Sequence, residues 1–185
     1  MIGCMSTAPR VRTEYTVEDY LRWEGRWELW EGVAVAMAPS PFGPHAKLLA
    51  RTVAALQSAV DAAGCDATVL VEIDWIVARD TVLRPDALVV CGSEPTRHVE
   101  RPPAVVVEVL SETTRDRDLS GKREIYREQG VAWYLVVDPE RGQLRAFVSD
   151  AAGRSVEQEL DERPVAIEIC GSCRFTIDPA AIFRR

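Results

Sequence analysis

Two short, almost wholly apolar runs flank a segment that has a helical pattern. Residues 104–110 read AVVVEVL, and residues 131–137 read VAWYLVV. Runs of this length and composition are typical of strands buried on both faces of a sheet. Between them, residues 119–129 form a predicted helix that Gly130 ends. A strand, a crossover helix and a second strand predict an α/β fold, with a mixed central β-sheet flanked by helices.

The remaining segments complete this fold. Thr16 opens a short predicted helix, to about Glu24, with a capping-box-like pattern. The pattern around Glu31 and Gly32 predicts an N-terminal hairpin. Further predicted elements are a helix at 45–63 and strands at 65–78 and 82–90, the second of which is interrupted at Pro85. An antiparallel C-terminal extension is predicted with strands at 143–148, 155–160 and 165–169. The chain is therefore predicted to have a flexible tail at 1–13 and a single domain at 14–185.

The net charge limits the kinds of partner. The chain has 29 acidic and 22 basic side chains and a net charge of −7. This balance argues against a general nucleic-acid binder, which usually carries a basic surface. A nuclease stays possible, because a local basic groove and bound cations can offset an acidic whole. No apolar run reaches the roughly 20 residues of a membrane span, and the N-terminus lacks a secretory core. We expect a cytoplasmic protein without membrane association.

The five cysteines are interpreted as reduced cytosolic thiols. They are Cys4, Cys65, Cys91, Cys170 and Cys173. The last two form the only Cys-x-x-Cys motif, and a zinc site needs four ligands, for which no second motif is present. Gly171 and Ser172 between them are typical of a hairpin turn. An incidental turn is therefore favoured over a metal or redox role.

Glu108 is the most informative side chain. It interrupts an otherwise apolar strand, and a buried carboxylate is costly unless it is paired or binds a metal. The alternative is an ion pair at the end of the strand with an arginine such as Arg84. Asp86 repeats the pattern, because it precedes the apolar run ALVV. Its alternative role is to cap the turn after Pro85.

Together the two acids predict a metal site. Carboxylates on neighbouring strands can converge on a hard cation such as Mg²⁺, which prefers oxygen ligands. The backbone carbonyl of Leu110, two residues beyond Glu108, can supply a third oxygen. Lys122, in the following helix, is a candidate to orient an attacking water or to stabilise charge on a phosphate. Its alternative is a solvated helix face, where most lysines lie.

These residues belong to an ordered set of motifs that closely resembles the Uma-two (Uma2) family. The family comprises proposed restriction endonucleases, a bacterial branch of the PD-(D/E)XK nuclease superfamily. The resemblance runs from about residue 15 to about residue 147. It is carried by WELWEG at 27–32, RPD at 84–86, PPAVVVEVLS at 102–111, TTR at 113–115, Asp118, Lys122, Tyr126, GV at 130–131 and YLVVDP at 134–139.

The resemblance implies a restriction-endonuclease-like fold and assigns roles to site residues. Asp86 and Glu108 would be the acidic metal ligands. The superfamily's usual lysine position is occupied here by Leu110, and the Uma2 pattern instead places the lysine at Lys122. Glu28 matches an acid on the opening hairpin. His45 is either an accessory site residue or the cap at the start of its helix.

The implied function is Mg²⁺-dependent (or Mn²⁺-dependent) hydrolysis of DNA by an endonuclease. Arg115, Arg117 and Arg123 are candidates to contact the DNA backbone, although an arginine-rich loop is more often simply solvated. Superfamily nucleases often act as dimers, so a homodimer is expected. Two alternatives stay open: a catalytically silent binding or regulatory module with a nuclease fold, and hydrolysis of RNA or a small nucleotide.

Overall fold

A mixed six-stranded sheet forms the centre of the computed structural model, which describes residues 14–37, 43–150, 154–160 and 163–184. In spatial order its strands are β10 (Ser155–Leu160), β9 (Gln143–Ser149), β8 (Trp133–Asp138), β7 (Val105–Val109), β6 (Ala87–Cys91) and β3 (Ala67–Val71). β7 and β8 are parallel, and the other neighbours are antiparallel. The predicted mixed sheet and its buried central strands are confirmed.

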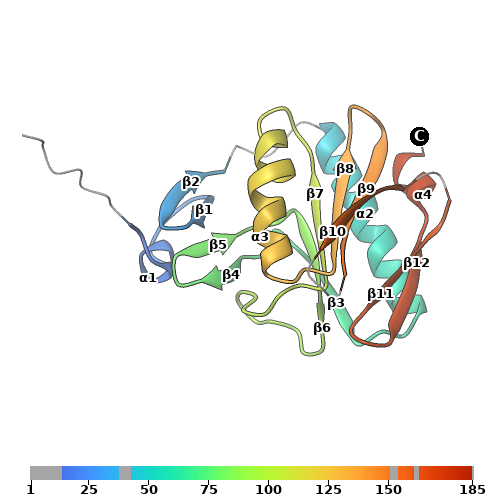
Figure 1. Ribbon diagram of the computed structural model, residues 1–185, viewed down its shortest axis with the longest axis horizontal. Helices are drawn as coiled ribbons and strands as arrows, with labels where there is room; N and C mark the ends of the chain where they lie inside the picture. Colours follow the sequence, from blue (N-terminus) through green and yellow to red (C-terminus); the bar gives the residue numbers. More distant parts are fainter. Residues whose placement is uncertain (1–13, 38–42, 151–153, 161–162, 185) are drawn as a thin grey trace, which may run out of the picture.

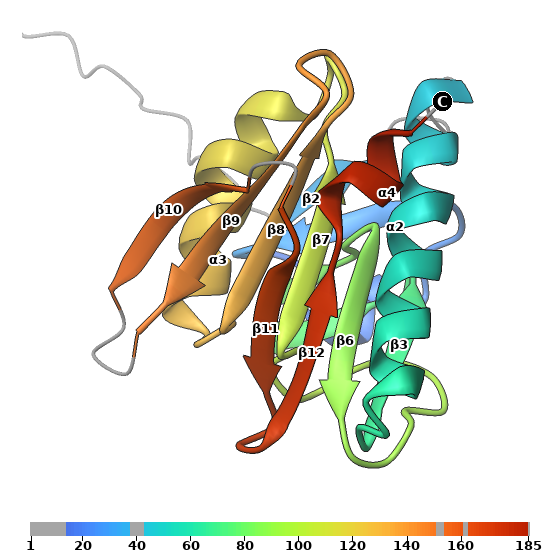
Figure 2. The same cartoon turned by 90° about the vertical axis from the view of Figure 1, so that its right-hand side faces the viewer.

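Helices cover both faces of this sheet (Figure 1). One face carries the long helix α2 (Gly43–Ala62), the short helix α4 (Pro179–Phe183) and a separate hairpin of β11 (Val165–Ile169) and β12 (Cys173–Ile177). Figure 2 shows this hairpin and α2 over the same face. The other face carries a π-helical turn, η1 (Arg117–Lys122), which continues into α3 (Arg123–Glu128). The crossover between β7 and β8 is thus helical, as predicted.

The alternation of side chains along β7 divides the core in two. Val105, Val107 and Val109 pack with α2 and the β11–β12 hairpin, whereas Val106 packs with residues on the α3 side. Successive strand residues point to opposite faces. Glu108 therefore shares the face of Val106, beneath the crossover helix.

An N-terminal lobe adjoins the α3 side of the sheet (Figure 1). It contains α1 (Val17–Tyr20) and a four-stranded sheet in the order β2 (Val33–Ala36), β1 (Trp27–Trp30), β5 (Thr81–Leu83) and β4 (Trp75–Ala78). The predicted hairpin is β1–β2. Glu31 and Gly32 form its two-residue turn with φ values of 46° and 79°, as a type I′ turn requires. The capping box at Thr16 is also confirmed, although α1 ends earlier than predicted.

Each of two predicted strands is divided between the six-stranded and the four-stranded sheet. The strand predicted at 65–78 is broken at Glu72, whose φ of 49° turns the chain from β3 into β4. The sequence does not indicate this turn, because Glu72 is neither glycine nor proline. The alternation of apolar and polar residues also continues past it. The interruption predicted at Pro85 is confirmed, since β5 ends at Leu83 and β6 begins at Ala87.

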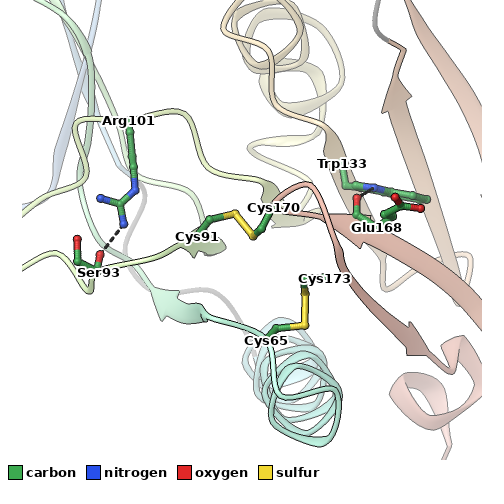
Figure 3. The surroundings of a disulfide bond; sticks show 8 residues. All are labelled: Cys65, Cys91, Ser93, Arg101, Trp133, Glu168, Cys170 and Cys173. Carbon is green, nitrogen blue, oxygen red and sulfur yellow. Dashed lines mark hydrogen bonds between the residues drawn. A yellow bond between two sulfur atoms is a disulfide. The ribbon is translucent and has the colours of Figure 1, made fainter.

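The interpretation of the cysteines as reduced thiols is wrong for four of them. Cys65 is bonded to Cys173, and Cys91 to Cys170, in two disulfides (Figure 3). The predicted hairpin turn is confirmed, but it is not incidental. Both of its cysteines are anchored to the main body of the protein. The partners lie 108 and 79 residues apart in the chain, so local spacing could not reveal them. Cys4 and the predicted tail at 1–13 lie outside the described residues.

None of the helices in the described ranges is both long and apolar enough to span a membrane. The cytoplasmic location stays a prediction, as does the single domain at 14–185.

Candidate active site

One cleft brings together the residues singled out in the sequence. It has a volume of about 640 Å³ and lies where the N-terminal lobe, the start of α2 and the ends of β6 and β7 meet. Five of its lining residues are Glu28, His45, Asp86, Glu108 and Lys122. They come from segments far apart in the chain, so the fold itself assembles the cluster.

The Lys122 ammonium lies between two buried carboxylates. Its Nζ donates to Glu108 Oε1 at 2.8 Å and lies 3.0 Å from Glu28 Oε1. The Tyr126 hydroxyl also donates to Glu108 Oε1, at 2.7 Å. All of these side chains are buried. The interpretation of Lys122 as a solvated helix residue is therefore wrong, because η1 turns this lysine inward.

Glu28 is fixed by the hairpin that carries it. Residues two apart on a strand share a face, and Trp30 Nε1 donates to Glu28 Oε2 at 3.1 Å. The backbone N–H of Arg84 donates to Glu28 Oε1 at 2.8 Å. The N-terminal lobe thus delivers a carboxylate whose two oxygens both accept hydrogen bonds.

The π-helical geometry of η1 adds a third acid. Asp118 and Lys122 both point inward, with Asp118 Oδ1 3.8 Å from Lys122 Nζ. The backbone carbonyl of Asp118 accepts a hydrogen bond from the Tyr134 hydroxyl at 2.9 Å. π-helical turns are rare and often occur at functional sites.

The cluster holds more acid than its one ammonium can neutralise. Burial raises the pKa of Glu108 well above its usual value, the Lys122 charge opposes this shift, and Asp118, Asp86 and Glu28 reinforce it. Burial likewise raises the pKa of Asp118. For Lys122, burial acts to lower the pKa, but the carboxylates of Glu108 and Glu28 outweigh it and the pKa is raised. Lys122 therefore stays charged, and the pKa of Glu108 stays raised despite this charge.

Asp86 lies at the more open side of the cluster. Its side chain is 18% exposed, against 4% for Glu108. Asp86 Oδ2 accepts a hydrogen bond from the Val109 N–H at 2.7 Å and lies 3.3 Å from His45 Nε2. The contact with Val109 ties Asp86 to the end of β7, next to Glu108. His45 is the third residue of α2 and lies in the site.

The other predicted contacts have mixed outcomes. Leu110 lines the cleft, and its carbonyl as a metal ligand stays a prediction. Arg115 and Arg117 also line the cleft, but Arg115 is bound to Asp138 at 2.9 and 3.1 Å. The guanidinium carbon of Arg123 lies 4.1 Å from the centre of the Phe147 ring, and Arg123 is not among the lining residues.

Gly121 allows η1 to pack against the Trp30 ring. A Cβ added at Gly121 would lie 2.7 Å from Trp30 Cζ3. We expect Gly121→Ala to lower the free energy of unfolding by about 1–3 kcal/mol, the usual cost of overpacking. Urea denaturation measures this. Gly43→Ala is the matched control, because a Cβ there meets nothing within 4 Å. Equal midpoints for the two variants would contradict the expectation.

Sequence reasoning gave no role to Asp118, Tyr126 or Trp30. A signal was nevertheless present, because Asp118, Lys122 and Tyr126 are spaced four residues apart, as side chains on one helical face are. Trp30 had a weaker signal, since it alternates with Glu28 on the opening hairpin.

Comparisons with known proteins bear on the family and the fold. The model of the Uma2 family, described as "Putative restriction endonuclease", matches residues 17–177. No curated protein matches the chain. A crystal structure described as a putative nuclease belonging to DUF820, from Anabaena variabilis, superposes with a TM-score of 0.74. The sequence identity is 15%, over 91% of this chain and 97% of that one, so the likeness bears on the fold.

The predicted restriction-endonuclease-like fold is thereby confirmed. The family match covers nearly all of the N-terminal lobe, the central sheet and the β11–β12 hairpin. The chain therefore belongs to the Uma2 family.

Proposed function

We propose that the chain is a divalent-metal-dependent endonuclease that hydrolyses phosphodiester bonds in DNA. The observation that carries this proposal is the convergence of Asp86, Glu108 and Lys122 in one cleft. Membership of a family described as restriction endonucleases supports nucleic acid as the substrate.

The two acids suit a hard cation. Asp86 uses Oδ2, and Glu108 uses Oε1, for their contacts with the protein. In the described part of the chain, Arg145 alone has buried side-chain atoms that lack a hydrogen-bond partner. Asp86 Oδ1 and Glu108 Oε2 are therefore not buried atoms without a partner. We infer that these two oxygens face the cleft.

The residues therefore fit Mg²⁺ or Mn²⁺, with Asp86, Glu108 and the Leu110 carbonyl as ligands. Among the described residues, no group of three or more His, Cys, Asp or Glu side chains is arranged so that it could hold a metal ion. Mg²⁺ does not need one, since it commonly binds one or two carboxylates and retains waters or phosphate oxygens. When bound, such an ion polarises a phosphate and lowers the pKa of a water.

The chain's own groups have separate tasks. Lys122 forms ion pairs with Glu108 and Glu28 and is the cation available to orient water or stabilise charge on the phosphate. His45 orients Asp86 through Oδ2. Arg117, for which no ion pair is found within the described ranges, is the best placed arginine to contact the DNA backbone.

The test is cleavage of plasmid DNA with Mg²⁺ or Mn²⁺ by wild type, Asp86→Asn and Asp61→Asn. Asp86→Asn keeps an oxygen that can accept the Val109 hydrogen bond but loses the charge. We expect cleavage to slow by about a hundredfold or more, as loss of several kcal/mol of metal-dependent stabilisation implies. Asp61→Asn is the control, because Asp61 is exposed on α2 and outside the cleft. Equal rates for all three proteins would contradict the assignment.

The alternative of a silent module has its own signature. Wild type would then cleave neither DNA nor RNA, and calorimetry would find weak Mg²⁺ binding that Asp86→Asn leaves unchanged. The observation that favours it is Lys122, which forms ion pairs with the buried Glu28 and Glu108 without a metal. The homodimer stays a prediction, which sedimentation analysis can test.

A further inference from the structure

Four cysteines meet at one end of the molecule, away from the candidate active site. Cys170 and Cys173 flank the tight turn between β11 and β12. Cys65 follows α2, and Cys91 ends β6. All four line a single cavity of about 490 Å³. Figure 3 shows both disulfides side by side at this turn.

The backbone holds the two partner cysteines next to each other. Ala67 pairs with Cys91 in the central sheet, and Cys65 lies two residues before Ala67. The Gly92 N–H donates to the Asp66 carbonyl at 2.8 Å, which closes this edge. The hairpin turn faces these neighbours, with Cα–Cα distances of 5.4 and 5.7 Å across the two disulfides. The four sulfur atoms therefore lie in one small region of the folded chain.

We propose that Cys65, Cys91, Cys170 and Cys173 form a four-thiolate site for Zn²⁺ when the two disulfides are reduced. A Cys-x-x-Cys turn supplying two ligands, with two more from another segment, is the arrangement of structural zinc sites. Sulfur atoms around tetrahedral Zn²⁺ lie about 3.8 Å apart, given Zn–S bonds of about 2.3 Å. The adjoining cavity gives the side chains room to rotate apart by that amount.

Formation of the site takes two steps: the disulfides are reduced, and Zn²⁺ then binds as protons are released. A phosphine or dithiol reductant donates two electrons to each disulfide, and the protein gains four thiols. Zn²⁺ then binds as the thiols lose four protons, leaving a site with a net charge of −2. Arg174 lines the same cavity and offsets part of this charge. The oxidised form offers no thiolate ligands, because all four sulfur atoms are in disulfides.

The fold explains why the hairpin needs a cross-link in either state. Among the described strands, β11 and β12 pair only with each other and form no hydrogen-bonded ladder with the central sheet. An isolated two-stranded hairpin is marginally stable. Yet Ile167, Phe175 and Ile177 from this hairpin are buried in the main core. Zn²⁺ would keep the hairpin docked in a reducing environment, as the disulfides do in an oxidising one.

Co²⁺ is the spectroscopic probe for the test. All proteins carry Cys4→Ser, so that only the four clustered thiols report. After reduction and removal of the reductant without oxygen, we expect one equivalent of Co²⁺ to give the intense visible and thiolate charge-transfer bands of tetrahedral tetrathiolate cobalt. Zn²⁺ should then bleach them. The bands should persist in Asp86→Asn, because carboxylate ligands give Co²⁺ only weak bands and the candidate active site is not their source. They should vanish in the double variant Cys170→Ser/Cys173→Ser.

A second measurement guards against misfolding of the double variant. In the reduced wild-type chain, Zn²⁺ should slow alkylation of the four thiols at least tenfold, and a chelator should restore the rate. Three results would overturn the proposal: alkylation that Zn²⁺ does not change, cobalt bands that survive in the double variant, or disulfides that reduce only when the chain unfolds. None of these readouts depends on DNA cleavage, so the proposal and the nuclease function can fail separately.

Discussion

Replacing Lys122 by methionine is expected to lower the free energy of unfolding by about 3–5 kcal/mol at neutral pH, the cost of removing one partner from a buried ion pair. Methionine keeps most of the side-chain volume, so the loss reflects the charge. Glu108 and Glu28 would lose the ammonium that now lies 2.8 and 3.0 Å from their oxygens. Urea denaturation measures the change, and the same variant should lose DNA cleavage.

The loss of stability in Lys122→Met should depend on pH in a defined direction. The folded-state pKa of Glu108 is already raised, chiefly by burial, and removing Lys122 raises it further because the ammonium lowers it. A raised pKa means that the folded state binds the proton more tightly than the unfolded state. Stability is then greatest below the unfolded pKa of about 4.3 and falls as the pH rises through the folded pKa. The deficit of Lys122→Met should therefore shrink towards acid pH.

Glu108→Gln supplies the control. Its amide oxygen can still accept the Tyr126 hydrogen bond, but it carries no charge. In the double variant Lys122→Met/Glu108→Gln, the Glu108 charge, which has lost its Lys122 partner in the single variant, is absent. The double variant should therefore be more stable at neutral pH than Lys122→Met alone, with a coupling free energy of about 0.5–3 kcal/mol. A deficit that is equal at acid and neutral pH, or no coupling, would show that the ion pair does not stabilise the fold.

Removing the Cys91–Cys170 disulfide should have a comparable effect. It joins residues 79 apart, and loss of a native disulfide commonly costs about 2–5 kcal/mol because the unfolded chain gains conformational freedom. Cys91→Ser/Cys170→Ser should therefore unfold at a lower urea concentration under metal-free, oxidising conditions. The Cys65–Cys173 loop encloses this one, so each disulfide closes a shorter effective loop while the other is intact. Deleting both disulfides should therefore cost more than the sum of the two single deletions.

Wild type unfolded with and without reductant gives the comparison for this prediction. The double variant should lose less stability on reduction than wild type, because one of its disulfides is already absent. If reductant leaves the wild-type midpoint unchanged in the presence of a chelator, the disulfides do not stabilise the hairpin.

The sequence predicted the central sheet well because its strands have strong local patterns. β7 and β8 are apolar runs of the right length, and the helix between them dictates the parallel pairing. The boundaries were predicted less well where the conformation is unusual for the residue. Glu72 turns the chain without glycine, and the π-helical turn of η1 has the composition of an ordinary helix. α4 was not predicted.

The candidate site was predicted in part for a similar reason. Glu108 was conspicuous because a charged residue in an apolar strand violates a local rule. Asp118 violates none, since an aspartate near the start of a helix is ordinary, and only the fold shows that it is buried. The cysteines were misjudged because their pairing depends on contacts between distant segments.

The contact between Glu28 and Lys122 can form only late in the synthesis of the chain. Glu28 leaves the ribosome early, on the first hairpin, whereas its partner arrives only after β7 has been made. Domains emerge from the N-terminus onwards, so a growing chain carries Glu28, Asp86 and Glu108 before any ammonium can join them. The cleft cannot be completed while the chain is short of Lys122. Unfinished chains would therefore lack a complete candidate active site, and the proposed hydrolysis would begin only once the crossover segment has emerged.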